Sequence, residues 1–104
     1  MKEKYTVFDP AEHLKSDTAI AEFIVAAIET NDAAFIAEAL GVAARAKGMS
    51  KVARDAGLAR ESLYRSLRKG GRPELSTLMR IMHVFGLKLA AQPEPKKKNR
   101  PKAA

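Results

Sequence analysis

The sequence predicts an all-α fold, a bundle of five helices. Ala and Leu supply much of the 46% hydrophobic fraction and aromatic residues only 6%, a composition that favours helices over strands. Apolar residues recur at spacings of three and four, and residues that cap or stop helices separate these runs. A length of 104 residues suits one domain, which we place at residues 1–92, followed by a tail at 93–104.

The N-terminal helices are predicted within residues 9–47. Asp9 is a suitable N-cap and Pro10 suits the first helical position, so a single helical turn is expected there. Ser16 or Asp17 is predicted to cap the next, longer helix. Its apolar stripe consists of Ile20, Phe23, Ile24, Ala27 and Ile28.

The following helix is predicted to begin after its cap at Asp32 and to end at Lys47 and Gly48. Gly41 interrupts it at a cost of about 1 kcal/mol relative to Ala, which we attribute to the close approach of another helix. The inward residues are expected to be Phe35, Ile36, Ala39, Leu40, Val42, Ala43 and Ala46.

Residues 50–68 have the layout of a lambda-repressor-like helix-turn-helix. Ser50 is predicted to cap the first helix, and Gly57 to supply the positive φ that a sharp turn needs. Ala53 is small, which leaves room for the second helix to cross. The core-facing positions are predicted to be Val52, Ala53, Ala56, Leu58, Leu63 and Leu67.

The outward side of the second helix is typical of a recognition helix in the DNA major groove. Arginine can donate two hydrogen bonds to guanine, glutamate can accept one from cytosine, and serine suits a base or a phosphate. Base contacts are therefore predicted for Arg60, Glu61, Ser62 and Arg65. Contacts to the DNA backbone are predicted for Ser50, Lys51, Arg54, Tyr64, Arg68, Lys69 and Arg72. The alternative is an ordinary helical hairpin with a solvated basic face.

The last helix is predicted at residues 76–85, capped by Ser76 and closed by Gly86. A loop with Pro73 precedes it. Its inward residues are expected to be Leu78, Met79, Ile81, Met82 and Phe85. Residues 87–90 and 5–8 are candidates for short terminal strands.

The charge is unevenly distributed. Residues 1–40 carry a net charge of −5, residues 41–92 carry +8, and residues 93–104 carry +4. Such asymmetry is expected of a protein that meets phosphate with one part and leaves an acidic part for another partner. The tail is predicted to be disordered, serving either solubility or nonspecific contact with phosphates.

Several function classes are excluded or disfavoured. The chain has no Cys, which excludes disulfides, thiolate nucleophiles and Cys-based zinc sites. His13 and His83 lack partners at zinc spacing, and the acidic residues near the N-terminus suit helix starts better than catalysis. We expect no enzyme activity, cofactor or metal. No apolar run is long enough for a signal peptide or a membrane span, so a soluble, cytoplasmic protein is expected.

The chain resembles the addiction-module antidote proteins, HigA-like helix-turn-helix antitoxins of bacterial type II toxin–antitoxin pairs. The resemblance extends over residues 8–89 and rests on residues 8–14, 43–50, 53–65 and 75–79. It implies a homodimer that binds double-stranded operator DNA upstream of its own operon, and a toxin partner similar to RelE-type ribonucleases. The Lys-rich tail is not part of the family pattern, and Arg72 stands where the family often has Asn.

Two other functions remain open from the sequence. The chain would suit a transcriptional regulator that acts without a toxin, and a helical interaction module that binds no DNA. A neighbouring toxin gene would distinguish an antitoxin from a regulator that acts without a toxin. Loss of DNA binding on replacement of Arg60 and Arg65 would distinguish these two DNA-binding functions from the interaction module.

Overall fold

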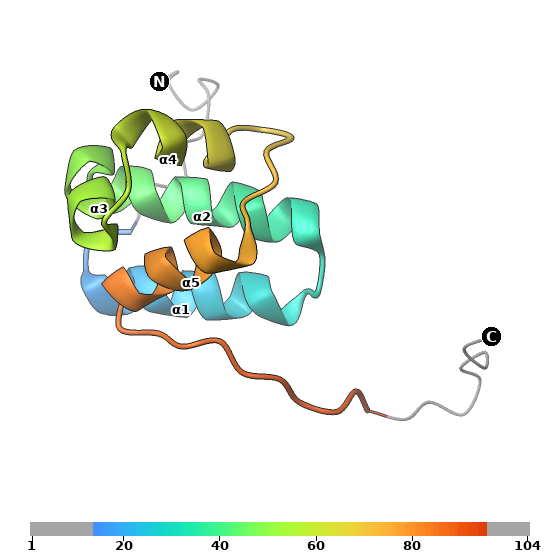
Figure 1. Ribbon diagram of the computed structural model, residues 1–104. Helices are drawn as coiled ribbons and strands as arrows, with labels where there is room; N and C mark the ends of the chain where they lie inside the picture. The colour runs from blue at the N-terminus through green and yellow to red at the C-terminus, as the bar shows by residue number, and fades with distance from the viewer. Residues whose placement is uncertain (1–13, 96–104) are drawn as a thin grey trace, which may run out of the picture.

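The computed structural model describes residues 14–95, which form five α-helices (Figure 1). They are α1 (Asp17–Glu29), α2 (Ala33–Lys47), α3 (Met49–Ala56), α4 (Arg60–Leu67) and α5 (Leu75–Val84). The all-α bundle predicted from the sequence is confirmed.

The strand predicted at residues 87–90 is wrong. These residues belong to an irregular segment that runs from the end of α5 away from the helices (Figure 1). No strand lies beside it within residues 14–95, and a lone strand has no ladder of hydrogen bonds to stabilise it. The candidate strand at 5–8, the helical turn expected at Asp9, and residues 96–104 of the tail lie outside the described residues.

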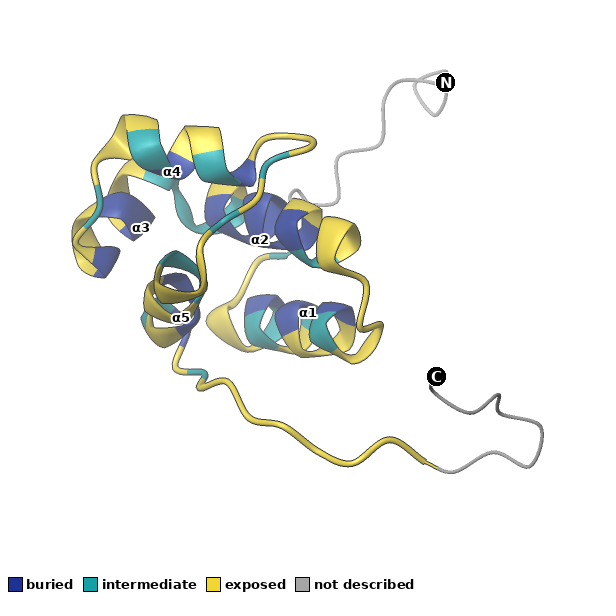
Figure 2. Ribbon diagram, turned by 45° about the vertical axis from the view of Figure 1, so that its right-hand side comes forward, coloured by how far each residue is buried: buried dark blue, intermediate teal, exposed yellow. Residues whose placement is uncertain are grey.

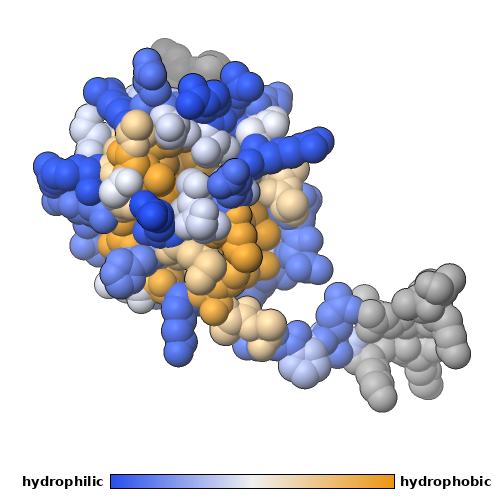
Figure 3. All heavy atoms as spheres, viewed as in Figure 1, coloured by the Kyte–Doolittle hydropathy of each residue, from blue (hydrophilic) through white to orange (hydrophobic). Residues whose placement is uncertain are grey.

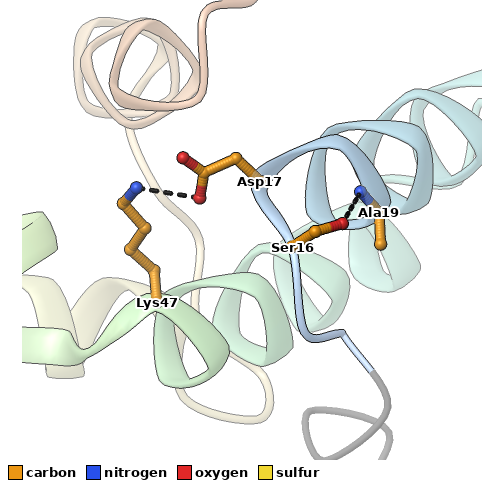
Figure 4. Close-up of polar contacts among 4 residues, drawn as sticks. All are labelled: Ser16, Asp17, Ala19 and Lys47. Atoms are coloured by element: carbon orange, nitrogen blue, oxygen red, sulfur yellow. Dashed lines mark hydrogen bonds and ion pairs between the residues drawn. The ribbon is translucent and has the colours of Figure 1, made fainter.

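Helices α1 and α2 form an antiparallel pair whose starts are capped as predicted. The Ser16 hydroxyl accepts a hydrogen bond from the Ala19 N–H at 3.0 Å (Figure 4), so Ser16 rather than Asp17 is the cap of α1. A carboxylate oxygen of Asp32 accepts hydrogen bonds from the Ala34 and Phe35 N–H groups at 3.1 and 3.2 Å. Each cap satisfies backbone donors that the first turn of a helix leaves unpaired.

An ion pair joins the start of α1 to the end of α2. The Lys47 ammonium, in the last turn of α2, lies 2.9 Å from a carboxylate oxygen of Asp17, in the first turn of α1 (Figure 4). Each charge also suits its helix end, because the helix dipole favours acids at the start and bases at the end. Asp17 is largely exposed, so the pair contributes at most about 1 kcal/mol.

The core lies where the five helices face one another (Figure 2). Each helix contributes at least one fully or nearly buried apolar residue, and the cluster consists of Ile20, Ile24, Leu40, Ala43, Ala44, Val52, Ala53, Leu63, Leu67, Ile81 and Phe85. The α3 and α4 residues of this cluster were all predicted to face inward. The helix-turn-helix is therefore part of the same core as the N-terminal helices.

Two residues predicted to face inward are exposed instead. Phe35 is 42% exposed and Met79 is 49% exposed. Phe35 lies in the first turn of α2 and lines a groove with Leu14 and Phe23. Met79 shares the outer side of α5 with Leu75, one turn earlier. Apolar spacing predicted the stripe on each helix but not its width, which depends on where the neighbouring helices end.

The caps predicted for α3 and α5 are also wrong. Gly48, with φ of 112°, is both the C-cap of α2 and the N-cap of α3. Helix α3 therefore begins at Met49, and Ser50 lies inside it. Helix α5 begins at Leu75, and the Glu74 carbonyl accepts the first helical hydrogen bond, so Ser76 also lies inside its helix. In neither helix does a side chain cap the start.

Candidate nucleic-acid interface

A sharp turn at Gly57 joins α3 to α4. Gly57 has φ of 72°, in the left-handed region that favours glycine, as the sequence predicted. Its N–H donates to the Arg54 carbonyl at 3.2 Å, and the Leu58 N–H donates to the Ala53 carbonyl at 2.9 Å. These two bonds form a Schellman motif, which ends α3 and sends the chain back across it.

Helix α4 is held in place from its inner side. Leu63 and Leu67 are buried, at 0% and 6% exposure. A Cβ atom on Gly41 would lie 3.0 Å from the Leu67 carbonyl oxygen, closer than side-chain carbons normally approach. The prediction that Gly41 permits close helix packing is therefore confirmed, and the helix that approaches is α4.

The outer side of α4 carries the residues for which base contacts were predicted. Arg60, Glu61 and Arg65 are exposed and Ser62 is half-buried. Arg60 and Glu61 lie in the first turn, which is the part of a recognition helix that reaches base edges in known complexes. The geometry is compatible with those contacts, which stay a prediction.

Tyr64 orients Arg60. The Arg60 guanidinium donates a hydrogen bond to the Tyr64 hydroxyl at 3.2 Å, and its central carbon lies 5.4 Å from the centre of the tyrosine ring. The two residues are four apart on one helix, where side chains are neighbours. Tyr64, predicted to contact the DNA backbone, thus contacts Arg60 and remains 46% exposed.

The other residues with predicted backbone contacts form two groups. Ser50, Lys51 and Arg54 are exposed on α3, and the Arg54 guanidinium lies 3.3 Å from the Asp55 carboxylate. Arg68, Lys69 and Arg72 are exposed in the segment that follows α4. Arg68 and Arg72 line one pocket together with Arg65, whereas Lys69 lines a different groove, formed largely by α2, which Arg68 also borders.

Sequence reasoning missed Arg80 as a residue of this site. From α5, its guanidinium donates hydrogen bonds to the carbonyl oxygens of Ala56 at 3.4 Å and Gly57 at 3.2 Å. These carbonyls belong to the end of α3, where a helix lacks intrahelical donors and a positive charge is favourable. No local pattern signals contacts between residues that lie 23 or 24 positions apart in the sequence.

Other kinds of site find little support in residues 14–95. No three His, Cys, Asp or Glu side chains of this part of the chain come together as metal ligands would. None of its helices combines the length and the apolar character needed to cross a membrane. The candidate site is the exposed basic surface around α4, which carries Arg60, Arg65, Arg68 and Arg72.

Comparison with known proteins relates the chain to a family. A family model described as a probable addiction module antidote protein matches residues 4–93. A protein of Haemophilus influenzae strain Rd is 39% identical over 92 residues, which cover 88% of this chain and 95% of the relative, and is described as an uncharacterized protein. No solved structure matches the chain.

Proposed function

Because the chain belongs to the family of probable addiction module antidote proteins, we propose that it is a DNA-binding antitoxin that represses its own operon. An antidote of a toxin–antitoxin module has a toxin as its partner and is not an enzyme. We further propose that the toxin is a RelE-like ribonuclease, that the antidote is HigA-like, and that it acts in the cytoplasm.

The observation that carries the DNA-binding proposal is the exposed face of α4, set on a buried anchor. Leu63 and Leu67 fix the helix to the core, while its outer side carries charged and polar residues. The proposed base contacts are those of Arg60, Glu61, Ser62 and Arg65. The proposed backbone contacts are those of Ser50, Lys51, Arg54, Tyr64, Arg68, Lys69 and Arg72.

A homodimer is proposed because helix-turn-helix proteins read palindromic operators with two copies. Apolar surface on α5 supports it. Leu75 and Met79, one turn apart, are 62% and 49% exposed. Figure 3 shows apolar side chains gathered on the face that α5 crosses. Large apolar residues grouped on a surface are typical of protein interfaces, and we propose that a second copy covers them.

The acidic surface of α1 supports a basic toxin as partner. Helix α1 contains Asp17, Glu22 and Glu29 and no basic residue, in a chain whose net charge is +7. Ribonucleases bind RNA through positive charge, so a toxin of that kind would be attracted to this helix rather than to α4. The two partners would then occupy different parts of the antidote.

A mobility-shift assay with DNA from upstream of the chain's own operon tests the DNA-binding proposal. The variant with Arg60→Ala and Arg65→Ala is expected to lose about 1–3 kcal/mol for each bidentate contact, while circular dichroism and melting stay unchanged. The matched control replaces Arg45 and Lys88, also exposed cations, by alanine. Equal binding by the two variants would contradict the proposal.

Co-purification with the product of the neighbouring gene tests the antitoxin proposal. We expect a stable complex that abolishes the ribonuclease activity of the toxin. Specific operator binding without any such complex would instead support a regulator that acts alone. If the chain neither binds the operator nor forms the complex, a helical interaction module would be supported.

A further inference from the structure

A second feature of the basic surface is a pocket of about 500 Å³ between α4 and the segment that leads to α5. Three arginines line it: Arg65 on α4, and Arg68 and Arg72 after it. None of their three guanidinium groups forms a hydrogen bond or ion pair with another residue of the described range 14–95. Glu74 is the acidic residue of the lining, so the pocket has a surplus of positive charge.

Hydroxyl groups stand beside these guanidinium groups. Ser62 and Ser66 on α4 and Thr77 on α5 line the same pocket and are half-buried. Guanidinium and hydroxyl donors together are the set that proteins use for phosphate oxygens. Thr77 and Ser66 had no role in the predictions from sequence, because only the fold brings the first turn of α5 and the last turn of α4 to the walls of one pocket.

Two glycines determine the shape of the pocket. Gly70 has φ of 79°, which favours glycine. The Gly71 N–H donates to the Arg68 carbonyl at 2.7 Å, and a Cβ atom at Gly71 would overlap the Ser66 carbonyl oxygen. The segment after α4 is therefore drawn back against the end of that helix, and the pocket lies between them.

We propose that this pocket binds a phosphate group. The phosphate ligands would be Ser66 and Thr77 alongside Arg68 and Arg72. If the phosphate belongs to a DNA strand, this proposal rests on the proposed function and deepens it. Arg65 and Ser62 join the pocket to the outer side of α4. A phosphate held there would fix the position of α4 along the DNA strand, so the pocket sets the register for base contacts.

The first arm of the test uses inorganic phosphate and the full chain. Amide signals of Gly70, Gly71 and Thr77 are expected to shift in NMR spectra with a saturable dependence on phosphate concentration. Arg72→Ala and Thr77→Val should each weaken this binding at least about fivefold, since each removes a direct hydrogen bond. Thr77→Val leaves the charge unchanged, which separates specific binding from general attraction.

Lys88→Ala is the matched control. It removes one exposed positive charge outside the pocket, at a residue with no proposed contact to DNA, so phosphate binding should stay unchanged. Shifts that chloride reproduces at equal ionic strength, or that Arg72→Ala and Thr77→Val leave unaltered, would overturn the proposal. Circular dichroism of each variant verifies that it is folded.

The second arm measures affinity for duplex DNA and identifies the source of the phosphate. For a DNA phosphate, Arg72→Ala and Thr77→Val should weaken binding to all duplexes by a similar factor and leave base preference unchanged. If both variants lose inorganic phosphate but bind DNA normally, the pocket takes a soluble phosphate compound and its role in DNA binding is wrong. If the parent protein binds phosphate but no duplex, the proposed function fails and the phosphate site stands.

Discussion

The Arg80 guanidinium lies 3.2 Å from the Gly57 carbonyl oxygen, to which it donates a hydrogen bond from α5 to the turn between α3 and α4. A second hydrogen bond, to the Ala56 carbonyl, reaches the end of α3 itself. Arg80 thus supplies donors that α3 lacks at its end, and it does so at the residue where the chain changes direction. The turn is determined by two distant parts of the sequence.

Replacement of Arg80 by alanine should therefore destabilise the turn. We expect Arg80→Ala to lower the free energy of unfolding by about 1 kcal/mol, because partly exposed hydrogen bonds are lost and the helix end loses a favourable charge. Chemical denaturation measures the change. Lys88→Ala, which removes an exposed cation after α5, is the control and should cost less than about 0.5 kcal/mol. Equal effects of the two substitutions would contradict the role of Arg80.

Gly57→Ala should cost more stability than Gly86→Ala. Both glycines have positive φ, 72° and 75°, so alanine is strained by about 1 kcal/mol at either position. Only at Gly57 would the new Cβ also lie close to a neighbour, 3.3 Å from the Arg80 guanidinium, whereas nothing lies within 4 Å at Gly86. Thermal unfolding of the two variants side by side measures the difference. A larger loss at Gly86 would show that the contact with Arg80 has no effect.

Gly41→Ala should destabilise the protein although alanine is the better helix former. Helix propensity alone would favour the substitution by about 1 kcal/mol. The added Cβ, 3.0 Å from the Leu67 carbonyl oxygen, would push α4 away from α2, and overpacking of this kind costs about 1–3 kcal/mol. Ala26→Gly, on the exposed side of α1, reports the propensity term by itself. An increase in melting temperature for Gly41→Ala would mean that α4 can shift freely.

Tyr64→Phe should weaken DNA binding without changing stability, if the proposed function is correct. The substitution removes the hydroxyl that accepts the hydrogen bond from Arg60 and keeps the ring beneath the guanidinium. Arg60 would then be less ordered before binding, and we expect a loss of about 0.5–1 kcal/mol in affinity. Operators altered at single base pairs identify the base concerned. A uniform loss at all positions would mean that Tyr64 acts only through its proposed contact with the DNA backbone and that its hydrogen bond with Arg60 has no effect on base contacts.

Features that depend on a few neighbouring residues were predictable from the sequence. The caps at Ser16 and Asp32 and the turn at Gly57 each follow from the conformation or hydrogen bonds of one residue within its own segment. The close approach at Gly41 followed from the cost of glycine in a helix. These local preferences agree with the final packing, so the predicted fold class is confirmed, and the arrangement of α3, the turn and α4 is compatible with the predicted helix-turn-helix.

Features that depend on distant contacts were not predictable. The Arg80 hydrogen bonds require that α5 lie beside α3, and the arginine pocket requires that the first turn of α5 share a lining with α4, which no local pattern specifies. The caps expected at Ser50 and Ser76 were wrong because each helix begins one residue before its serine, α3 at Met49 and α5 at Leu75. Met79 was wrongly predicted to face inward because the rest of the protein covers only a narrow side of α5.

The single-residue junction at Gly48 has a mechanical consequence. Because one residue both ends α2 and begins α3, the two helices are joined without a longer linker. A rotation of α3 against the α1–α2 hairpin would therefore have to occur at the two backbone torsions of Gly48, and the burial of Val52 and Ala53 in the shared core opposes it.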